Sequence, residues 1–213
     1  GTSLYRYLTE VGVAKDTEPV AWVEVISQKA ARGDLAAAYS GVKGADGRVE
    51  NLYLAMSHTP LAITAADDHY RAVLHNPDNP LDPWLAEFAG TYVAILCGCN
   101  YAAVNHGENF RMYLGDDAKA ALWLAALRDG SWKDVLEGPV LAATLFTQKL
   151  SQAPAAMQED DIAGLRAAGF SDKAISYLIQ IVSSFAYWAR MINALGIRLG
   201  PTIGLTSVAP PES

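Results

Sequence analysis

Apolar residues recur along most of the chain at the three-to-four-residue spacing of an amphipathic α-helix. The clearest stripe follows residues 169–172, which read Gly-Phe-Ser-Asp. An apolar stripe on one side of a helix is buried against neighbouring elements, so this segment is predicted to be a core helix. The stripe consists of Ile175, Leu178, Ile179, Val182, Ala186 and Ala189.

Turn-forming residues divide the remaining pattern into further helices. Pro60 separates two helical stretches, because the proline ring removes a backbone donor. Asp82 and Pro83 form an N-cap and first-position pair, so a helix is expected to begin there. Gly98 interrupts that helix, and another follows directly. The stretches with a helical pattern before the final helix are 30–42, 49–75, 84–98, 100–114, 117–130, 133–154 and 158–172.

The predicted fold class is all-α, because no internal repeat and no long linker interrupts the helical pattern. One helical domain is expected over residues 22–199. Residues 21–27 have the β-branched character of a short extended arm. Residues 1–21 form an N-terminal extension, and residues 200–213 are expected to be an arm or a disordered tail, since proline and glycine occur there without periodicity.

Composition narrows the classes of partner. The chain has 213 residues, of which 51% are hydrophobic, enough for one sizeable core. Its net charge of −7 leaves no surplus of cations to neutralise phosphates, so neither nucleic acid nor an anionic membrane is expected as a partner. No apolar run approaches the roughly 20 residues of a membrane-spanning helix, and the N-terminus lacks the pattern of a secretory signal. A cytoplasmic protein is expected.

Both cysteines of the chain lie in the segment Ile95–Phe110, which reads ILCGCNYAAVNHGENF. Cys99 falls at the predicted start of the helix that follows Gly98. The amide donors and the positive dipole end of a helix N-terminus favour a thiolate, so we expect a lowered thiol pKa there. His106 lies seven residues further on, on the same helix face, and could accept a proton through a water or a neighbouring group.

Cys97 is not an obvious partner for Cys99. Residues two apart in a helix point about 200° away from each other, so a disulfide between them needs a broken backbone. Gly98 could permit such a break. The alternative interpretation is that both cysteines are small apolar residues in a buried helix pair, and that His106 is a core histidine.

The sequence resembles the alkylhydroperoxidase-like (AhpD) and carboxymuconolactone decarboxylase superfamily, especially its peroxidase-related branch. That signature is a glutamate, then C-x-x-C with tyrosine before the second cysteine, then a histidine. Here the matching residues are Glu87, Cys99, Tyr101 and His106, and the second cysteine falls on Ala102. Three further stretches resemble the branch, and together the likeness covers about residues 22–199. They are WVEVIS at 22–27, GRVENLYLAMSHTP at 47–60 and the segment at 160–197.

This resemblance implies an AhpD-like helical bundle and a thiol-based peroxidase. In the family, one thiolate attacks a peroxide oxygen and becomes a sulfenic acid, and the other resolves it as a disulfide. The resemblance assigns Glu87 as the base, His106 as the proton shuttle and Cys99 as the remaining thiol. Ala102 can neither attack nor resolve, which predicts a weakened activity or dependence on an external thiol reductant. Cys97 is a possible substitute.

Glu87 stands in an otherwise apolar helix, where an acid is either on a solvated stripe or buried with a partner. The helix pattern by itself favours the solvated position. The resemblance favours a buried Glu87 hydrogen-bonded through water toward His106.

Two other functions stay open. In the decarboxylase branch no cysteine is needed, and Glu87 with His106 would transfer protons on a small carboxylated substrate. A non-catalytic member of the fold is the third possibility, favoured by Ala102. The resemblance also implies a homo-oligomer.

No cofactor and no metal is expected from the sequence. It contains no glycine-rich phosphate loop and no C-x-x-C-H haem site. Asp67, Asp68 and His69 are adjacent and would diverge on a helix, so a solvated face is favoured over a metal site. The aromatic residues are expected to be core or pocket wall, namely Trp84, Tyr92, Tyr101, Phe110, Tyr113, Phe185, Tyr187 and Trp188.

Overall fold

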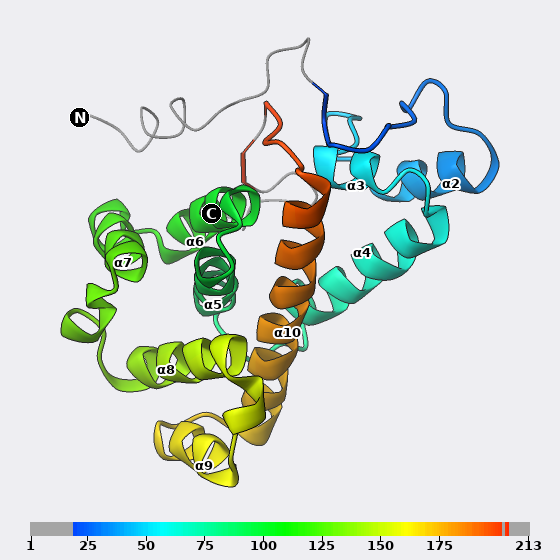
Figure 1. The fold of residues 1–213 in the computed structure, drawn as a ribbon. Helices are drawn as coiled ribbons and strands as arrows, with labels where there is room; N and C mark the ends of the chain where they lie inside the picture. The colour runs from blue at the N-terminus through cyan, green and yellow to red at the C-terminus, as the bar shows by residue number, and fades with distance from the viewer. Residues whose placement is uncertain (1–18, 202, 205–213) are drawn as a thin grey trace. The chain divides into compact units, whose positions relative to one another are not determined.

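The computed structural model describes residues 19–201, 203 and 204, which form helices joined by turns (Figure 1). No strand occurs among these residues, so the all-α prediction is confirmed. The expected arm at 21–27 is irregular backbone. The elements are α2 (Gly33–Gly41), α3 (Asn51–Ala55), α4 (Pro60–Leu74), α5 (Pro83–Leu96), α6 (Asn100–Leu114), α7 (Asp117–Asp129), the 3₁₀ turn η1 (Ser131–Asp134), α8 (Gly138–Gln152), the 3₁₀ turn η2 (Pro154–Ala156), α9 (Glu159–Ala167) and α10 (Asp172–Leu195).

Most helix boundaries follow the turn residues. Helix α4 begins at Pro60, and α5 begins at Pro83 with Asp82 as its N-cap. Gly130 adopts a left-handed conformation with a φ of 86° directly after α7. Each boundary lies where the sequence pattern placed it, because proline and glycine act through the local backbone.

The start of α8 differs from the prediction. The stretch 133–154 was expected to be one long helix, but α8 begins at Gly138, after η1 and a short irregular segment. Pro139 follows directly, and a proline is tolerated only in the first turn of a helix because it has no amide hydrogen. The apolar residues before it, including the buried Trp132 and Leu136, mimic a helical pattern without forming one.

Residue contacts divide the chain into two compact units, Gly1–Tyr70 with Met191–Ser213, and Arg71–Arg190. In the first unit the Trp22 amide donates to the Leu195 carbonyl over 2.8 Å, and the Arg198 amide donates to the Val20 carbonyl over 3.0 Å. The Asn51 side chain donates to the Arg198 carbonyl over 2.9 Å. These bonds join the two ends of the first unit. The single domain expected over residues 22–199 stays a prediction.

The final helix has the buried face that its pattern predicts. Within the second unit, Leu178 and Ile181 are fully buried, and Ile175 and Val182 nearly so. Ile179 and Ala186 are half-buried, so they form the edge of the buried face rather than its centre. The spacing of apolar residues therefore predicted both the helix and the side of it that is buried. The predicted stripe differs from the buried face only at its edge.

Helices α5 and α6 pack against each other in the second unit (Figure 1). An aromatic cluster fastens both to α7. The Phe88 ring lies 4.9 Å from the Phe110 ring and 5.6 Å from the Trp123 ring, between centroids. Phe110 and Trp123 are stacked at 6.3 Å. Rings of this size dominate core energetics, so the cluster holds α5 and α6 in a fixed pair.

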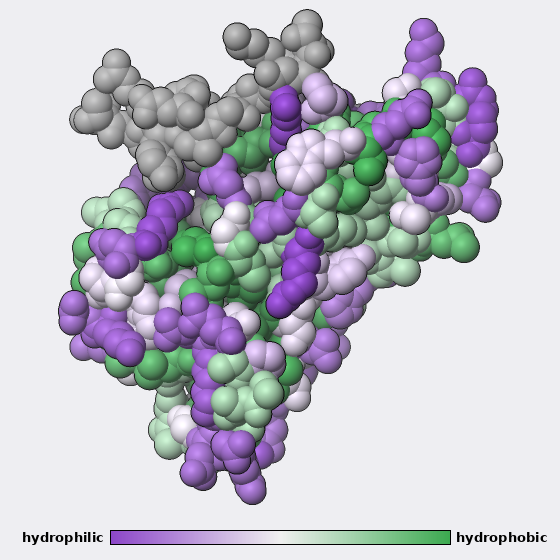
Figure 2. Space-filling model, viewed as in Figure 1, coloured by the Kyte–Doolittle hydropathy of each residue, from purple (hydrophilic) through white to green (hydrophobic). Residues whose placement is uncertain are grey.

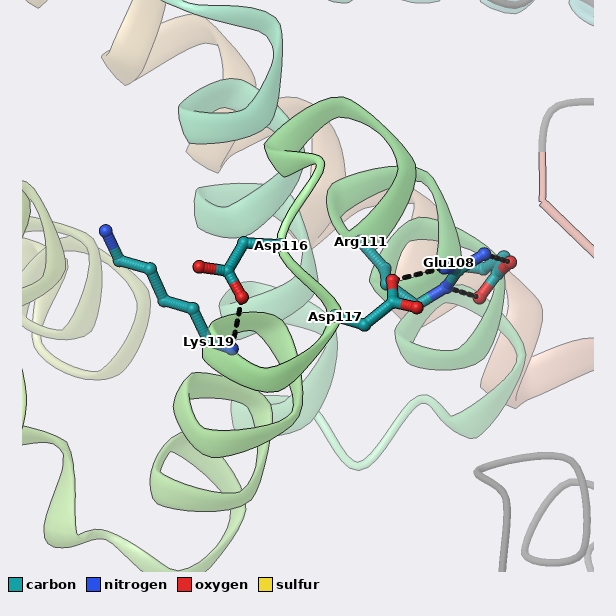
Figure 3. Close-up of polar contacts among 5 residues, drawn as sticks. All are labelled: Glu108, Arg111, Asp116, Asp117 and Lys119. Atoms are coloured by element: carbon teal, nitrogen blue, oxygen red, sulfur yellow. Dashed lines mark hydrogen bonds and ion pairs between the residues drawn. The ribbon is translucent and has the colours of Figure 1, made fainter. Parts of the chain in front are cut away.

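Charged side chains join the end of α6 to the start of α7 (Figure 3). Arg111 donates to both carboxylate oxygens of Glu108, at 2.9 and 2.6 Å, and to Asp117 at 2.6 Å. Asp116 caps α7 by accepting from the Lys119 amide at 3.0 Å. Glu108 is thereby held in an ion pair with Arg111.

One acidic residue departs from its expected environment. Asp67 was expected on a solvated face with Asp68 and His69, but only 5% of it is exposed, and it accepts a hydrogen bond from the Tyr53 hydroxyl at 2.6 Å. Asp68 and His69 are exposed. The tyrosine from α3 explains the difference, because a buried carboxylate needs a donor that the local sequence does not reveal.

Hydrophilic and hydrophobic side chains alternate over the face of the molecule drawn in Figure 2. A helix must combine length with high hydropathy to cross a membrane, and none formed by the described residues does so.

The predicted N-terminal extension lies outside the described residues up to position 18, and most of the predicted tail lies outside them as well.

Candidate active site

The turn between α5 and α6 places Cys99. Gly98 adopts a left-handed conformation with a φ of 63° and donates its amide to the Ile95 carbonyl at 3.0 Å. The Cys99 amide donates to the Ala94 carbonyl at 2.8 Å. This pair of bonds is the Schellman motif that ends many helices. Cys99 is therefore the N-cap of α6, as the sequence predicted.

Glu87 is buried in the middle of α5, with 1% of it exposed. Its Oε2 lies 2.7 Å from Nδ1 of His106, and its Oε1 accepts from the Asn109 side-chain amide at 3.1 Å. The resemblance predicted a buried Glu87 with a water between it and His106. Burial is confirmed, but the carboxylate reaches the imidazole directly, because α5 and α6 pack closely at this level.

The Glu87 contact sets the chemistry of the His106 ring. When Nδ1 donates its proton to a carboxylate, Nε2 carries the lone pair and is the basic nitrogen. The His106 side chain is 16% exposed, so the ring is buried on one side and accessible on the other. A carboxylate and an imidazole in this arrangement can act together as a general base.

The negative charge of Glu87 also acts on a neighbour. Burial raises the pKa of the Tyr113 phenol, and the Glu87 carboxylate raises it further. Tyr113 lies one turn after Asn109 on α6. The site thus contains a buried carboxylate that contacts the His106 ring and the Asn109 amide, and its charge raises the pKa of the Tyr113 phenol.

Phe185 from α10 packs edge-on against the imidazole of His106, with 4.5 Å between ring centroids. Gly90 makes room for that ring. A Cβ atom built on Gly90 would lie far inside contact distance of three Phe185 ring carbons. Glycine at this position of α5 is therefore required by packing, because its backbone conformation is an ordinary helical one.

The pKa of the Cys99 thiol is shifted in the direction opposite to the one that the sequence predicts. Burial raises its pKa above the ordinary value of 9.0, since only 1% of the residue is exposed. The amides of Ala102 and Tyr101 lower the pKa, but none makes a capping hydrogen bond to the sulfur. Desolvation therefore outweighs the helix N-terminus, and the predicted lowering of the pKa is wrong.

A thiolate titration tests whether the pKa of Cys99 is raised. In the Cys97→Ser variant, where Cys99 is the remaining thiol, the ultraviolet absorbance of thiolate should rise at a higher pH than in an unfolded control peptide, because burial disfavours the anion. The same shift makes this thiol's contribution to folding stability complete below the unfolded thiol's pKa and lost as pH rises through the folded one. A titration midpoint below that of an unfolded control peptide would contradict the assignment.

Tyr101 and Ala102 occupy the first turn of α6, and both are buried. Ala102 therefore presents a methyl group where the resembling family has a second thiol. The structure brings Glu87 and His106 into contact and leaves Cys99 two turns from His106 on the same helix. Among the described residues, no cluster of three histidine, cysteine or acidic side chains could hold a metal ion.

Sequence reasoning missed Asn109 and gave Phe185 only a general role. Asn109 is 3% exposed and lies one turn after His106, so the spacing of a histidine and an asparagine three residues apart was the available signal. Phe185 was expected to be core or pocket wall, and it is 2% exposed. Its contact with His106 depends on two helices far apart in sequence.

Comparison with known proteins supports the fold. No protein-family model matches the chain, and no curated protein sequence does. The chain superposes on the alkylhydroperoxidase AhpD core of an uncharacterised peroxidase-related protein from Ralstonia eutropha JMP134, with a TM-score of 0.75, 23% identity and coverage of 87% of this chain and 95% of that one. An uncharacterised peroxidase-related protein from Silicibacter sp. TM1040 gives a TM-score of 0.70 and 20% identity, covering 89% and 96%.

A third structure shares less. A protein of unknown function from Agrobacterium tumefaciens, described as an antioxidant defence protein of AhpD type, gives a TM-score of 0.54 and 16% identity, covering 69% of this chain and 95% of that one. At these identities the likeness concerns the fold. The described chain thus has the AhpD-like helical fold, as the resemblance implied.

Proposed function

We propose that this chain is a peroxidase-related, AhpD-like protein that reduces a small peroxide through the thiol of Cys99. Glu87 and His106 serve as its proton relay. The 2.7 Å contact between the buried Glu87 carboxylate and Nδ1 of His106 carries the proposal. A buried carboxylate bonded to an imidazole stabilises the protonated ring, which a proton relay requires.

The reaction has one displacement and two proton transfers, from the thiol to His106 and from His106 to the leaving oxygen. His106 Nε2 takes the proton of the Cys99 thiol, and the sulfur then attacks the terminal peroxide oxygen. The O–O bond breaks, the sulfur becomes a sulfenic acid, and the alkoxide leaves with the proton held on His106. The products are a sulfenic acid and an alcohol, or water if the substrate is hydrogen peroxide.

Water passes the proton between Cys99 and His106. The two residues are seven positions apart on α6, which is about 10 Å along the helix axis. They share a helix face, and the amides of Ala102 and Tyr101 favour the thiolate. The raised pKa of Cys99 keeps its thiolate fraction small at neutral pH, so we expect a slow reaction that accelerates as pH rises.

The remaining expectations belong to the same proposal. An external thiol reductant supplies the electrons that return the oxidised Cys99 to the thiol, because Ala102 supplies no second thiol in the first turn of α6. We further propose a cytoplasmic homo-oligomer with a small peroxide as substrate.

The Ala102→Cys variant tests the proposal that Cys99 reduces peroxide through its thiol. A second thiol at this position restores the C-x-x-C spacing, in which the two sulfurs of a helix start can form a disulfide. In a Cys97→Ser background, we expect Ala102→Cys to raise peroxide consumption with a dithiol donor at least about tenfold, because an internal thiol then replaces a bimolecular step.

Ala103→Cys is the matched control. Ala103 is also buried, at 6% exposure, but its side chain points about 100° away around α6, so this variant should gain nothing. If neither the parent chain nor Ala102→Cys consumes peroxide, the proposed role of the Cys99 thiol is wrong. Equal gains in both variants would also contradict it, because position would then not matter.

A second function is favoured by the burial of Cys99. A decarboxylase-like lyase needs no thiol, and the Glu87–His106 dyad would move a proton on a small carboxylated substrate. A chain with both cysteines replaced by serine distinguishes the two functions. Retained turnover of a carboxylated lactone by that chain would favour the lyase, and loss of peroxide consumption would favour the peroxidase. Absence of both activities in the parent chain would identify a non-catalytic member of the fold.

A further inference from the structure

We propose that Cys97 is the resolving thiol of this site and that it forms a disulfide with Cys99 across Gly98. This inference rests on the proposed function, since it concerns the fate of oxidised Cys99. It adds a catalytic residue where the C-x-x-C spacing offers only Ala102.

The backbone removes the obstacle that a continuous helix would place to such a disulfide. Inside a helix, residues two apart point in nearly opposite directions, which forbids the bond. Neither cysteine is inside a helix here. Cys97 is the C-cap of α5, with φ −85° and ψ −1°, and Cys99 is the N-cap of α6, with φ −92° and ψ 89°. Gly98 between them is left-handed, with φ 63°, so the right-handed helical path is broken at the required residue.

The expected span between the two Cα atoms does not oppose the bond. A helical turn of either hand has a radius of about 2.3 Å and rises about 1.5 Å per residue, which puts Cα atoms two residues apart at about 5.4 Å. A disulfide requires a Cα separation of roughly 4.4–6.8 Å. The two hydrogen bonds to Ile95 and Ala94 hold this turn in place.

The two thiols also influence each other. After burial and the Ala102 amide, the neighbouring Cys97 is the next largest influence on the Cys99 thiol, and it raises the pKa. A charge acts over several ångströms, so this influence places the two thiols in one neighbourhood. Both cysteines are thiols in the structure.

Their exposure suits different roles. Cys99 is buried, whereas Cys97 is half-exposed. The Cys97 thiol attacks the Cys99 sulfenic acid, the S–O bond breaks, an S–S bond forms and water leaves. An external dithiol then attacks the accessible sulfur of Cys97, releases the Cys99 thiolate and becomes a disulfide itself, which returns both thiols of the protein.

Peroxide treatment followed by dimedone trapping and peptide mass spectrometry tests the assignment in the full chain. In the parent, we expect a mass loss of two hydrogens on the peptide that contains both cysteines, and little trapped sulfenic acid. In Cys97→Ser, we expect at least about tenfold more trapped sulfenic acid on Cys99, because the internal thiol has an effective concentration in the millimolar range or above. The Cys99→Ser chain is the control and should show neither product.

The outcomes separate this inference from the proposed function. Equal trapping in the parent and in Cys97→Ser, without a disulfide, overturns the resolving role and leaves the peroxide chemistry standing. A disulfide between two chains also overturns it. If peroxide modifies neither thiol, the proposed function fails. Oxidation with diamide then tests separately whether Cys97 and Cys99 can form a disulfide. An internal disulfide formed by diamide supports the juxtaposition of the two sulfurs, and its absence overturns it.

Discussion

The Gly90→Ala variant is expected to unfold at a lower temperature and to lose most of its activity. A Cβ on Gly90 overlaps the Phe185 ring, so either the ring or helix α5 must move. Overpacking of this kind costs about 1–3 kcal/mol, more than the roughly 1 kcal/mol that alanine gains over glycine in a helix interior. A net loss of about 1 kcal/mol corresponds to a fall of about 2–4 °C in Tm for a chain of this length.

The activity should fall with the stability, because Phe185 packs on His106. Gly164→Ala is the matched control. Gly164 lies in α9 with ordinary helical backbone, and nothing lies within 4 Å of a Cβ built on it. That substitution should raise the Tm slightly and leave activity unchanged. Thermal unfolding of both variants decides the point, and a Gly90→Ala chain as stable as the parent would mean that Phe185 does not occupy the space above Gly90.

The Glu87→Gln variant is expected to fold but to react more slowly by about 10²–10⁴-fold, the range for loss of a general acid–base group. The amide keeps the size of the carboxylate and can still accept from Asn109, but it has no charge to stabilise protonated His106. The measured quantities are kcat and KM for peroxide with a dithiol donor. A fall in kcat with little change in KM is expected, because the dyad acts on proton transfer rather than on binding.

Glu108→Gln is the control for a lost carboxylate on the same helix pair. Glu108 pairs with Arg111 at the partly exposed end of α6, and ion pairs of this kind contribute up to about 1 kcal/mol. Its kcat should match that of the parent chain. If Glu87→Gln retains full kcat while its Tm falls, Glu87 has a structural role only, and the relay proposal is wrong.

The sequence was most informative wherever local backbone chemistry decides the structure. Pro60 and Pro83 begin helices because a proline suits the first turn and not the interior. Gly98 ends α5 because only glycine adopts a left-handed turn without strain. The placement of Cys99 as a helix N-cap follows from these local rules. Pro139 obeys the same rule, but the apolar residues before it suggested a longer helix than the one that forms.

The sign of the Cys99 pKa shift shows where such reasoning fails. The helix N-terminus is visible in the sequence and favours the thiolate, whereas the extent of burial depends on packing against residues elsewhere in the chain. The expected solvated position of Asp67 is wrong for the same reason, because its hydrogen-bond donor Tyr53 comes from another helix. In both cases a tertiary contact reversed an expectation drawn from neighbours in sequence.

The sequence by itself determined the helical class, most helix ends and the candidate reactive side chains, because these depend on period, turn residues and residue type. Only the tertiary structure decided that the Glu87 carboxylate meets His106 directly, that Asn109 and Phe185 complete the site, and that Cys99 is desolvated. Helix packing sets these contacts, and packing depends on the shapes of residues that lie far apart along the chain.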